Sequence, residues 1–162
     1  MNMFRFLSML SIFYLFVTPV FAEEKVVDGF SVNLGIISWE QIQESMKEKP
    51  AAHTEGYHYK IAREMAKMHK GGKKGTHHIL VVLNDKKTGR RIDQADVKVN
   101  VISRVLPQNE IIKLKPMTID EYSGFGEFVK IRYKGPYILL VIFRLSEKDE
   151  FKEVKFVQEF GG

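Results

Sequence analysis

The amino-acid sequence predicts a mostly-β protein, a seven-stranded antiparallel β-sandwich of immunoglobulin type with a short helical insertion after the first strand. Three observations support this fold class. About seven stretches alternate between apolar and polar residues or run as short apolar segments, as strands in a packed sheet do. Turn-forming residues separate most of these stretches. Helical spacing of apolar residues is confined to one region, after the first of them.

The chain begins with a segment typical of an export signal. Met1–Arg5 is short and positively charged, Phe6–Val17 is almost wholly apolar, and Val20–Ala22 offers small residues for a signal peptidase. We therefore expect residues 1–22 to be a signal peptide and residues 23–162 to form one domain, periplasmic or secreted. The alternative is a retained membrane anchor, but the apolar stretch is shorter than the roughly 20 residues of a spanning helix.

The first strand of the mature domain is predicted over Val26–Ile37, where apolar and polar residues alternate. A helix over Trp39–Lys47 should follow, because Ser38 and Gln41 fit a capping box before apolar residues at helical spacing.

A second helix is predicted over Tyr57–His69, which has good helix formers and neither Pro nor Gly. The segment 51–75 is therefore expected to be a helical and flexible excursion, rich in His and Met. It ends in the positively charged connector Lys70–Gly75.

The central pair of strands is predicted within residues 76–101. Ile79–Leu83 is a continuous apolar run, which indicates a strand covered on both faces, and Ala95–Val101 alternates cleanly. We interpret these two as neighbouring strands of one sheet.

The remaining strands are predicted from alternation between turn signals. Their expected positions are Glu110–Lys115, Phe128–Tyr133, Tyr137–Leu145 and Phe151–Gln158. Pro116 and Met117 are expected to close the first of them, and Ser123–Gly126 is expected to be a glycine-rich turn.

Composition excludes several classes of function. The 162 residues carry a formal net charge of +5 with Lys and Arg spread along the chain, a pattern of a solvated surface rather than a nucleic-acid interface. Cysteine is absent, so neither disulfides nor a thiolate nucleophile can form. No nucleophile elbow, phosphate loop or zinc-protease motif is present, and we expect no enzymatic activity.

Histidine and methionine cluster in one part of the chain. All five histidines fall within 26 residues, and two methionines lie in the same window. Imidazole and thioether groups together favour copper, because thioethers select the softer Cu(I). The candidate ligands are Met65, Met68, His69, His77, His78 and Met117, with His58 and His53 as outer members. The sequence thus predicts binding and delivery of copper or a similar transition metal.

The competing interpretation is structural. Methionines at helical spacing often fill a core, and a histidine pair before a strand can lie on the surface. In that case the protein is a non-catalytic interaction module of the cell envelope, docking a partner through a sheet edge or the connector Lys70–Gly75.

Part of the sequence resembles small exported bacterial domains of immunoglobulin type, the YtkA-like and FixH-like families. The resemblance covers about residues 75–145 and is carried by HHILVVLNDKKTGRRIDQADVKVNV, KPM, GFGEFVKI and KGPYILLVIF. The chain is also similar, more distantly, to periplasmic iron- and copper-binding sandwich proteins. That likeness implies that Met117 is a strand-end metal ligand and that His77 or His78 is a strand-start ligand. Ser123–Gly126 replaces the His-Tyr-Gly stretch of those proteins, so a common ligand is missing.

Overall fold

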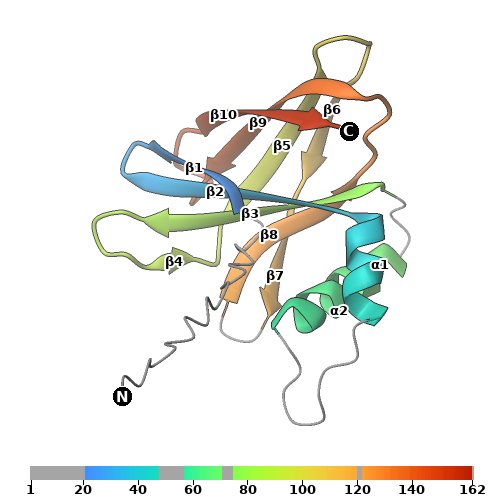
Figure 1. Ribbon diagram of the computed structural model, residues 1–162. Helices are drawn as coiled ribbons and strands as arrows, with labels where there is room; N and C mark the ends of the chain where they lie inside the picture. The colour runs from blue at the N-terminus through green and yellow to red at the C-terminus, as the bar shows by residue number, and fades with distance from the viewer. Residues whose placement is uncertain (1–20, 48–56, 71–74, 120–121, 162) are drawn as a thin grey trace, which may run out of the picture.

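The computed structural model describes residues 21–47, 57–70, 75–119 and 122–161. Within these residues the chain forms ten strands and two helices (Figure 1). In chain order the elements are β1 (Phe21–Val27), β2 (Phe30–Ser38), α1 (Trp39–Lys47), α2 (Tyr57–Lys70), β3 (His77–Asp85), β4 (Arg91–Ile92), β5 (Asp96–Ser103), β6 (Asn109–Lys113), β7 (Lys115–Ile119), β8 (Tyr122–Val129), β9 (Gly135–Arg144) and β10 (Lys152–Phe160).

The strands form two antiparallel sheets that pack as a sandwich. The six-stranded sheet, here called sheet A, has the order β1-β2-β3-β8-β7, with β4 paired to β3. The four-stranded sheet, sheet B, has the order β10-β9-β5-β6. The predicted mostly-β sandwich is confirmed, although the described residues form ten strands where the sequence indicated seven.

The main core lies between the two sheets. Alternate residues of each strand point inward, and on β9 this inward set is Tyr137, Leu139, Val141 and Phe143, each 0% exposed. Inward residues of β3 and β5 meet them, among them Ile79 and Val99. Burial of this many large side chains is the main source of stability for a chain without disulfides.

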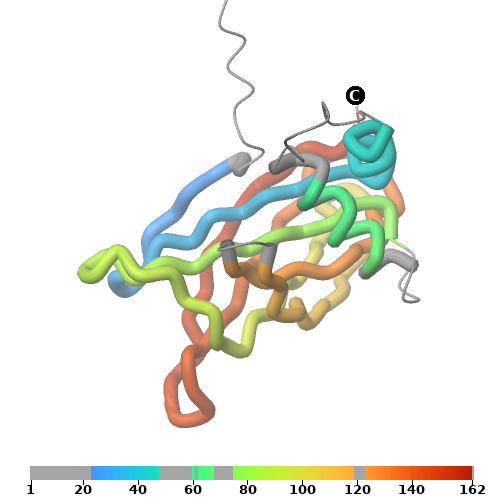
Figure 2. Tube along the Cα trace, turned by 90° about the horizontal axis from the view of Figure 1, so that it is seen from below, coloured from blue at the N-terminus to red at the C-terminus, as the bar shows by residue number. Residues whose placement is uncertain are grey.

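Both helices cover the outer face of sheet A. The capping box is confirmed: the backbone N–H of Gln41 donates to Ser38 Oγ at 3.2 Å, and the N–H of Ser38 donates to Gln41 Oε1 at 2.9 Å. The helix α2 packs on β7 and β8, and Figure 2 shows both helices beside sheet A. Together they form a second apolar cluster around the buried Ile42, Met65 and Phe128.

Several strand predictions are wrong, and each has a physical reason. The strand predicted over Val26–Ile37 is a hairpin of β1 and β2. Its turn is Asp28-Gly29, with φ of 46° and 82°, and Asp-Gly is among the strongest hairpin signals because both residues tolerate positive φ.

The two central strands are not neighbours. Ile79–Leu83 belongs to β3 in sheet A, whereas Ala95–Val101 falls mostly within β5 in sheet B. Alternation determines which face a residue takes, but it does not name the partner strand. The coverage of β3 on both faces is confirmed, since Ile79 lies in the main core and Leu80 packs on the helix cluster.

Ser123–Gly126 is not a turn, because β8 runs through it from Tyr122 to Val129 and ends well before Tyr133. Likewise, Pro116 and Met117 do not end a strand but lie within β7. Proline is tolerated there because β7 is at the edge of sheet A.

Candidate metal centre

The two adjacent histidines of β3 point to opposite faces of sheet A, as neighbouring residues of a strand do. His77 is half-buried at the end of the sandwich, where its ring lies 5.0 Å from that of Phe160 and its Nδ1 is 2.9 Å from Thr76 Oγ1. Burial lowers the pKa of His77, and the charge of Glu40 acts in the opposite direction. His78 instead lies on the face that the helices cover.

His78 is the most unusual polar residue on this face. Its side chain is fully buried, with its ring edge-on to Phe128 at a centroid distance of 4.9 Å. Among the residues that the structure describes, neither Nδ1 nor Nε2 has a hydrogen-bond partner. Buried polar atoms without partners are rare in native proteins, and an unseen water or ion is a common explanation.

The electrostatics of this position keep the imidazole neutral. Burial lowers the pKa of His78 to about 4, and the nearby charge of Glu127 only partly opposes this effect. A neutral imidazole has one nitrogen with a free lone pair, which is the form that binds a metal ion.

Met117 lies beside His78, and Gly126 makes this possible. A Cβ added to Gly126 would stand 2.7 Å from Met117 Sδ, 2.5 Å from His78 Cε1 and 3.0 Å from His78 Nε2. The thioether and the imidazole therefore meet over the same backbone position, at a place where any side chain would collide with both. Gly126 pairs with Leu80 on one side and with Lys115 on the other, so three strands place the two groups.

Met65 of α2 lies in the apolar cluster on the same face of sheet A. It is 0% exposed on α2 and belongs to the same apolar cluster as Phe128, with Met117 packed against that cluster. The group formed by His78, Met117 and Met65 is here called the His–Met cluster. No group of three or more His, Cys, Asp or Glu residues that could hold a metal ion occurs within the described ranges.

Of the predicted ligand set, the structure places His78 beside Met117, with Met65 in the apolar cluster on the same face of sheet A and His77 on the other face. His58, Met68 and His69 belong to α2, but their side chains lie outside the described part of the molecule, as does the whole of His53.

Sequence reasoning did not single out Glu127. This residue is 1% exposed, its Oε1 accepts a hydrogen bond from the backbone N–H of Phe128 at 3.1 Å, and its Oε2 lies 3.3 Å from Lys115 Nζ. A charged residue inside an apolar, glycine-containing strand is the signal that would have drawn attention to it.

No helix in the described residues is long and apolar enough to cross a membrane. No family model and no curated protein matches the chain. The two antiparallel sheets, with helices packed on one of them, define the fold as a small β-sandwich.

Several solved structures share this fold. FetP of uropathogenic Escherichia coli, expressed in the periplasm, has a TM-score of 0.57 and 9% identity over 85% of this chain and 92% of that chain. Copper-reconstituted P19 of Campylobacter jejuni has a TM-score of 0.56 and 11% identity over 85% and 92% of the two chains. A DUF4426 family protein of Pseudomonas aeruginosa has a TM-score of 0.51 and 11% identity over 85% and 96%.

At these identities the likeness establishes the fold alone. FetP and P19 are also known in copper-bound form. The resemblance to the YtkA-like and FixH-like families stays a prediction, whereas the more distant likeness to copper-binding sandwich proteins is confirmed at the level of fold.

Proposed function

We propose that the protein binds copper, as Cu(I), in the His–Met cluster beneath α2 and delivers it to a recipient in the cell envelope. The observation that carries this proposal is the fully buried His78, whose ring nitrogens have no partner among the described residues, beside the sulfur of Met117. The copper-bound FetP and P19 structures, which share the fold, support it.

The donor set fits this ion. One neutral imidazole and two thioethers are soft ligands without net charge, and thioethers favour Cu(I) over Cu(II) and Zn(II). Bound copper would supply no catalytic chemistry in this proposal, because the ion is cargo. His78 would hold it through a ring nitrogen, and Met117 and Met65 through Sδ.

The surroundings of the cluster suit protection and transfer of an ion. The rings of Phe128 and Trp39 pack edge-to-face with their centroids 5.9 Å apart. They border the cluster on one side, which limits its contact with water. Met117 is only partly buried and belongs to the edge strand β7, so it gives the ion a route to the surface. We therefore assign Met117 the role of the entry and exit ligand.

The location we propose is the periplasm or the exterior of the cell. Residues 1–22 would act as the signal peptide and residues 23–162 as the single binding domain, without enzymatic activity of its own. An oxidising compartment also suits a site without cysteine, because thioether and imidazole ligands cannot be lost to disulfide formation.

Titration of the purified protein with Cu(I), Cu(II) and Zn(II) tests the proposal, with bound metal followed by native mass spectrometry and affinity by chelator competition. We expect one Cu(I) per chain. The substitution His78→Gln should abolish binding, and Met117→Leu and Met65→Leu should each weaken it by about tenfold or more, a loss of at least ~1.4 kcal/mol.

His77→Gln is the matched control, because it removes the neighbouring imidazole from the opposite face of β3 and should leave the affinity unchanged. Cu(I) binding that survives His78→Gln, or that is lost equally in His77→Gln, contradicts the proposed site. The absence of any binding by the wild-type protein would favour the non-catalytic interaction module.

A further inference from the structure

The outer face of sheet B carries aliphatic side chains where a solvated sheet usually carries polar ones. On β9 the inward residues alternate with Ile138, Leu140 and Ile142, which point outward. Neighbouring strands add Ile111, which is 63% exposed, and Val157, which is 50% exposed. Ile102 on β5 pairs with Ile138 and completes the set. This set of six aliphatic residues is here called the sheet B patch.

No described element covers the sheet B patch. The helices α1 and α2 make their contacts with β2, β7 and β8 of the other sheet. Aliphatic residues thus gather on four adjacent strands of one face, with Asn100 between Leu140 and Ile111, and exposed apolar patches are typical of protein interfaces.

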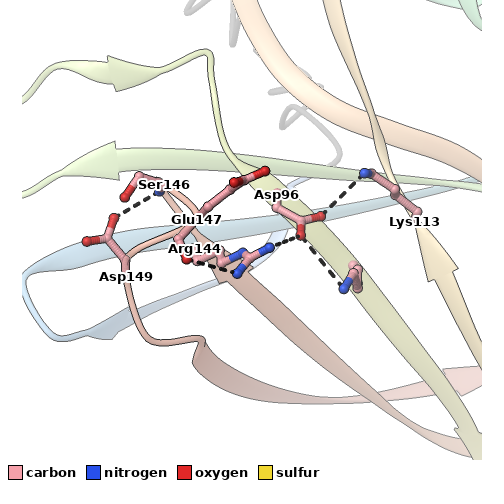
Figure 3. A network of polar contacts seen from close by, with 7 residues as sticks. Asp96, Lys113, Arg144, Ser146, Glu147 and Asp149 are labelled. Carbon is pink, nitrogen blue, oxygen red and sulfur yellow. Dashed lines mark hydrogen bonds and ion pairs between the residues drawn. The ribbon is translucent and has the colours of Figure 1, made fainter.

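Charged residues at one end of the patch are arranged by sign across the sheet. The hydrogen-bonded register places Glu153, Ile142, Lys98 and Lys113 in one row, from β10 at one edge to β6 at the other. In the next row Arg144 pairs with Asp96, and Figure 3 shows Asp96 between Arg144 and Lys113. In each of these two rows, residues on the β10–β9 half of the sheet and residues on the β5–β6 half carry opposite signs, and the order of the signs reverses between the rows.

We propose that a second copy of this chain docks face to face on the sheet B patch, with a two-fold axis that lies in the interface, parallel to the strands and between β9 and β5. Such an axis places β10 of one copy over β6 of the other. Ile138 then meets Ile102 of the second copy, and Glu153 meets Lys113 of the second copy. Two-fold symmetry forms each of these contacts twice.

The charge pattern favours this two-fold axis, and it favours a second copy of the chain as the partner. A two-fold axis running across the strands would set the apolar row of Val157 against the charged row of Glu153, which is unfavourable. A partner whose surface carried only one sign of charge would be repelled either by Glu153 or by Lys98 and Lys113 of the same row. A second copy supplies the opposite sign on both sides, and the aliphatic stem of Lys155 can cover Ile111 of the second copy. The proposal is independent of copper binding.

Analytical ultracentrifugation and native mass spectrometry of the full mature protein test for the dimer, at concentrations up to about 100 µM, which covers weak specific interfaces. We expect dimers that dissociate on dilution. The double variant Ile111→Asp with Val157→Asp should weaken dimerisation by about a hundredfold, because two charges enter the apolar contact in each copy. Both residues are at least half exposed, so the fold should persist in circular dichroism.

Val26→Asp is the matched control, since Val26 is 58% exposed on β1 of the other sheet and should leave dimerisation unchanged. A wild-type protein that stays monomeric at 100 µM, or a double variant that dimerises as wild type does, overturns the proposal.

A charge exchange tests the axis itself. The variants Lys113→Glu and Glu153→Lys should each dimerise about tenfold more weakly, because each places like charges at two symmetric contacts. When the two variants are mixed, every such contact again joins opposite charges, and a one-to-one heterodimer of wild-type strength should form. The variant with both exchanges should also regain self-association. Failure of the mixture to recover would overturn the proposed arrangement.

Discussion

The two outer faces of the sandwich have similar chemistry but different surroundings. The outer face of sheet A carries Leu80, Phe128 and Met117, and the outer face of sheet B carries the sheet B patch. Only the first face is covered within the described residues, because the insertion after β2 folds into α1 and α2 and packs on it. The cover converts an apolar sheet surface into an interior, and His78 on this face is fully buried.

This comparison teaches that the helical insertion adds a second apolar interior to the one between the two sheets. His78 is fully buried on the outer face of sheet A, where Met65 of α2 belongs to the apolar cluster against which Met117 packs. The sandwich contributes the strand register that places His78 and Met117 around Gly126.

The largest expected difference in stability between the two faces comes from truncating one apolar side chain on each face to alanine. Phe128→Ala should destabilise the protein by about 4 kcal/mol, because it leaves a cavity between α2 and β8. Ile111→Ala on the sheet B patch should change the unfolding free energy of the monomer by less than about 0.5 kcal/mol. Urea denaturation at low protein concentration measures both values. Equal losses for the two variants would show that the faces do not differ as described.

A smaller effect is expected from filling the space over Gly126. Gly126→Ala should destabilise the protein by about 3 kcal/mol, because its Cβ collides with the His78 ring and Met117 Sδ. The control is the double variant Gly126→Ala with Met117→Ala, which removes part of the collision. It should be less destabilised than the sum of the two single variants. Strict additivity in denaturant unfolding would contradict the described contact.

Much of the fold could be predicted from local sequence patterns. The helix α1 begins after its capping box at Ser38, and α2 spans the predicted residues to within one position. The strands β9 and β10 likewise match their predicted ranges within two residues. In each case the signal, which is capping, helix propensity or alternation, lies in residues that are close in the sequence.

The rest depends on contacts between distant residues. The sequence does not reveal that β3 and β5 belong to different sheets, because strand pairing is a tertiary property. The glycines of β8 indicated a turn, yet Gly124 and Gly126 are in the strand because Leu80 and His78 approach them closely. The sequence prediction grouped His77 and His78 as ligands of one site, but alternation along β3 places them on opposite faces, and the contact of His78 with Met117 depends on the register of three strands.

The enclosed histidine also predicts how stability depends on pH. The pKa of His78 is about 4 in the folded protein and about 6.5 when the chain is unfolded. Because burial depresses the folded pKa, the unfolded state takes up protons first as pH falls below 6.5. The stability present at pH 7 should therefore decrease by about 2 kcal/mol by pH 5, and further towards pH 4.

This loss should belong to His78 rather than to acid titration in general. Glu127, whose charge acts on His78, and the other carboxylates are retained in His78→Gln. Chemical denaturation of wild type and variant at pH 7 and pH 5 isolates the difference. A His77→Gln protein should keep most of the dependence, because His77 is only half-buried and in contact with Thr76. If His78→Gln lost as much stability between the two pH values as wild type, His78 would not be the enclosed, neutral imidazole on which the comparison of the two faces depends.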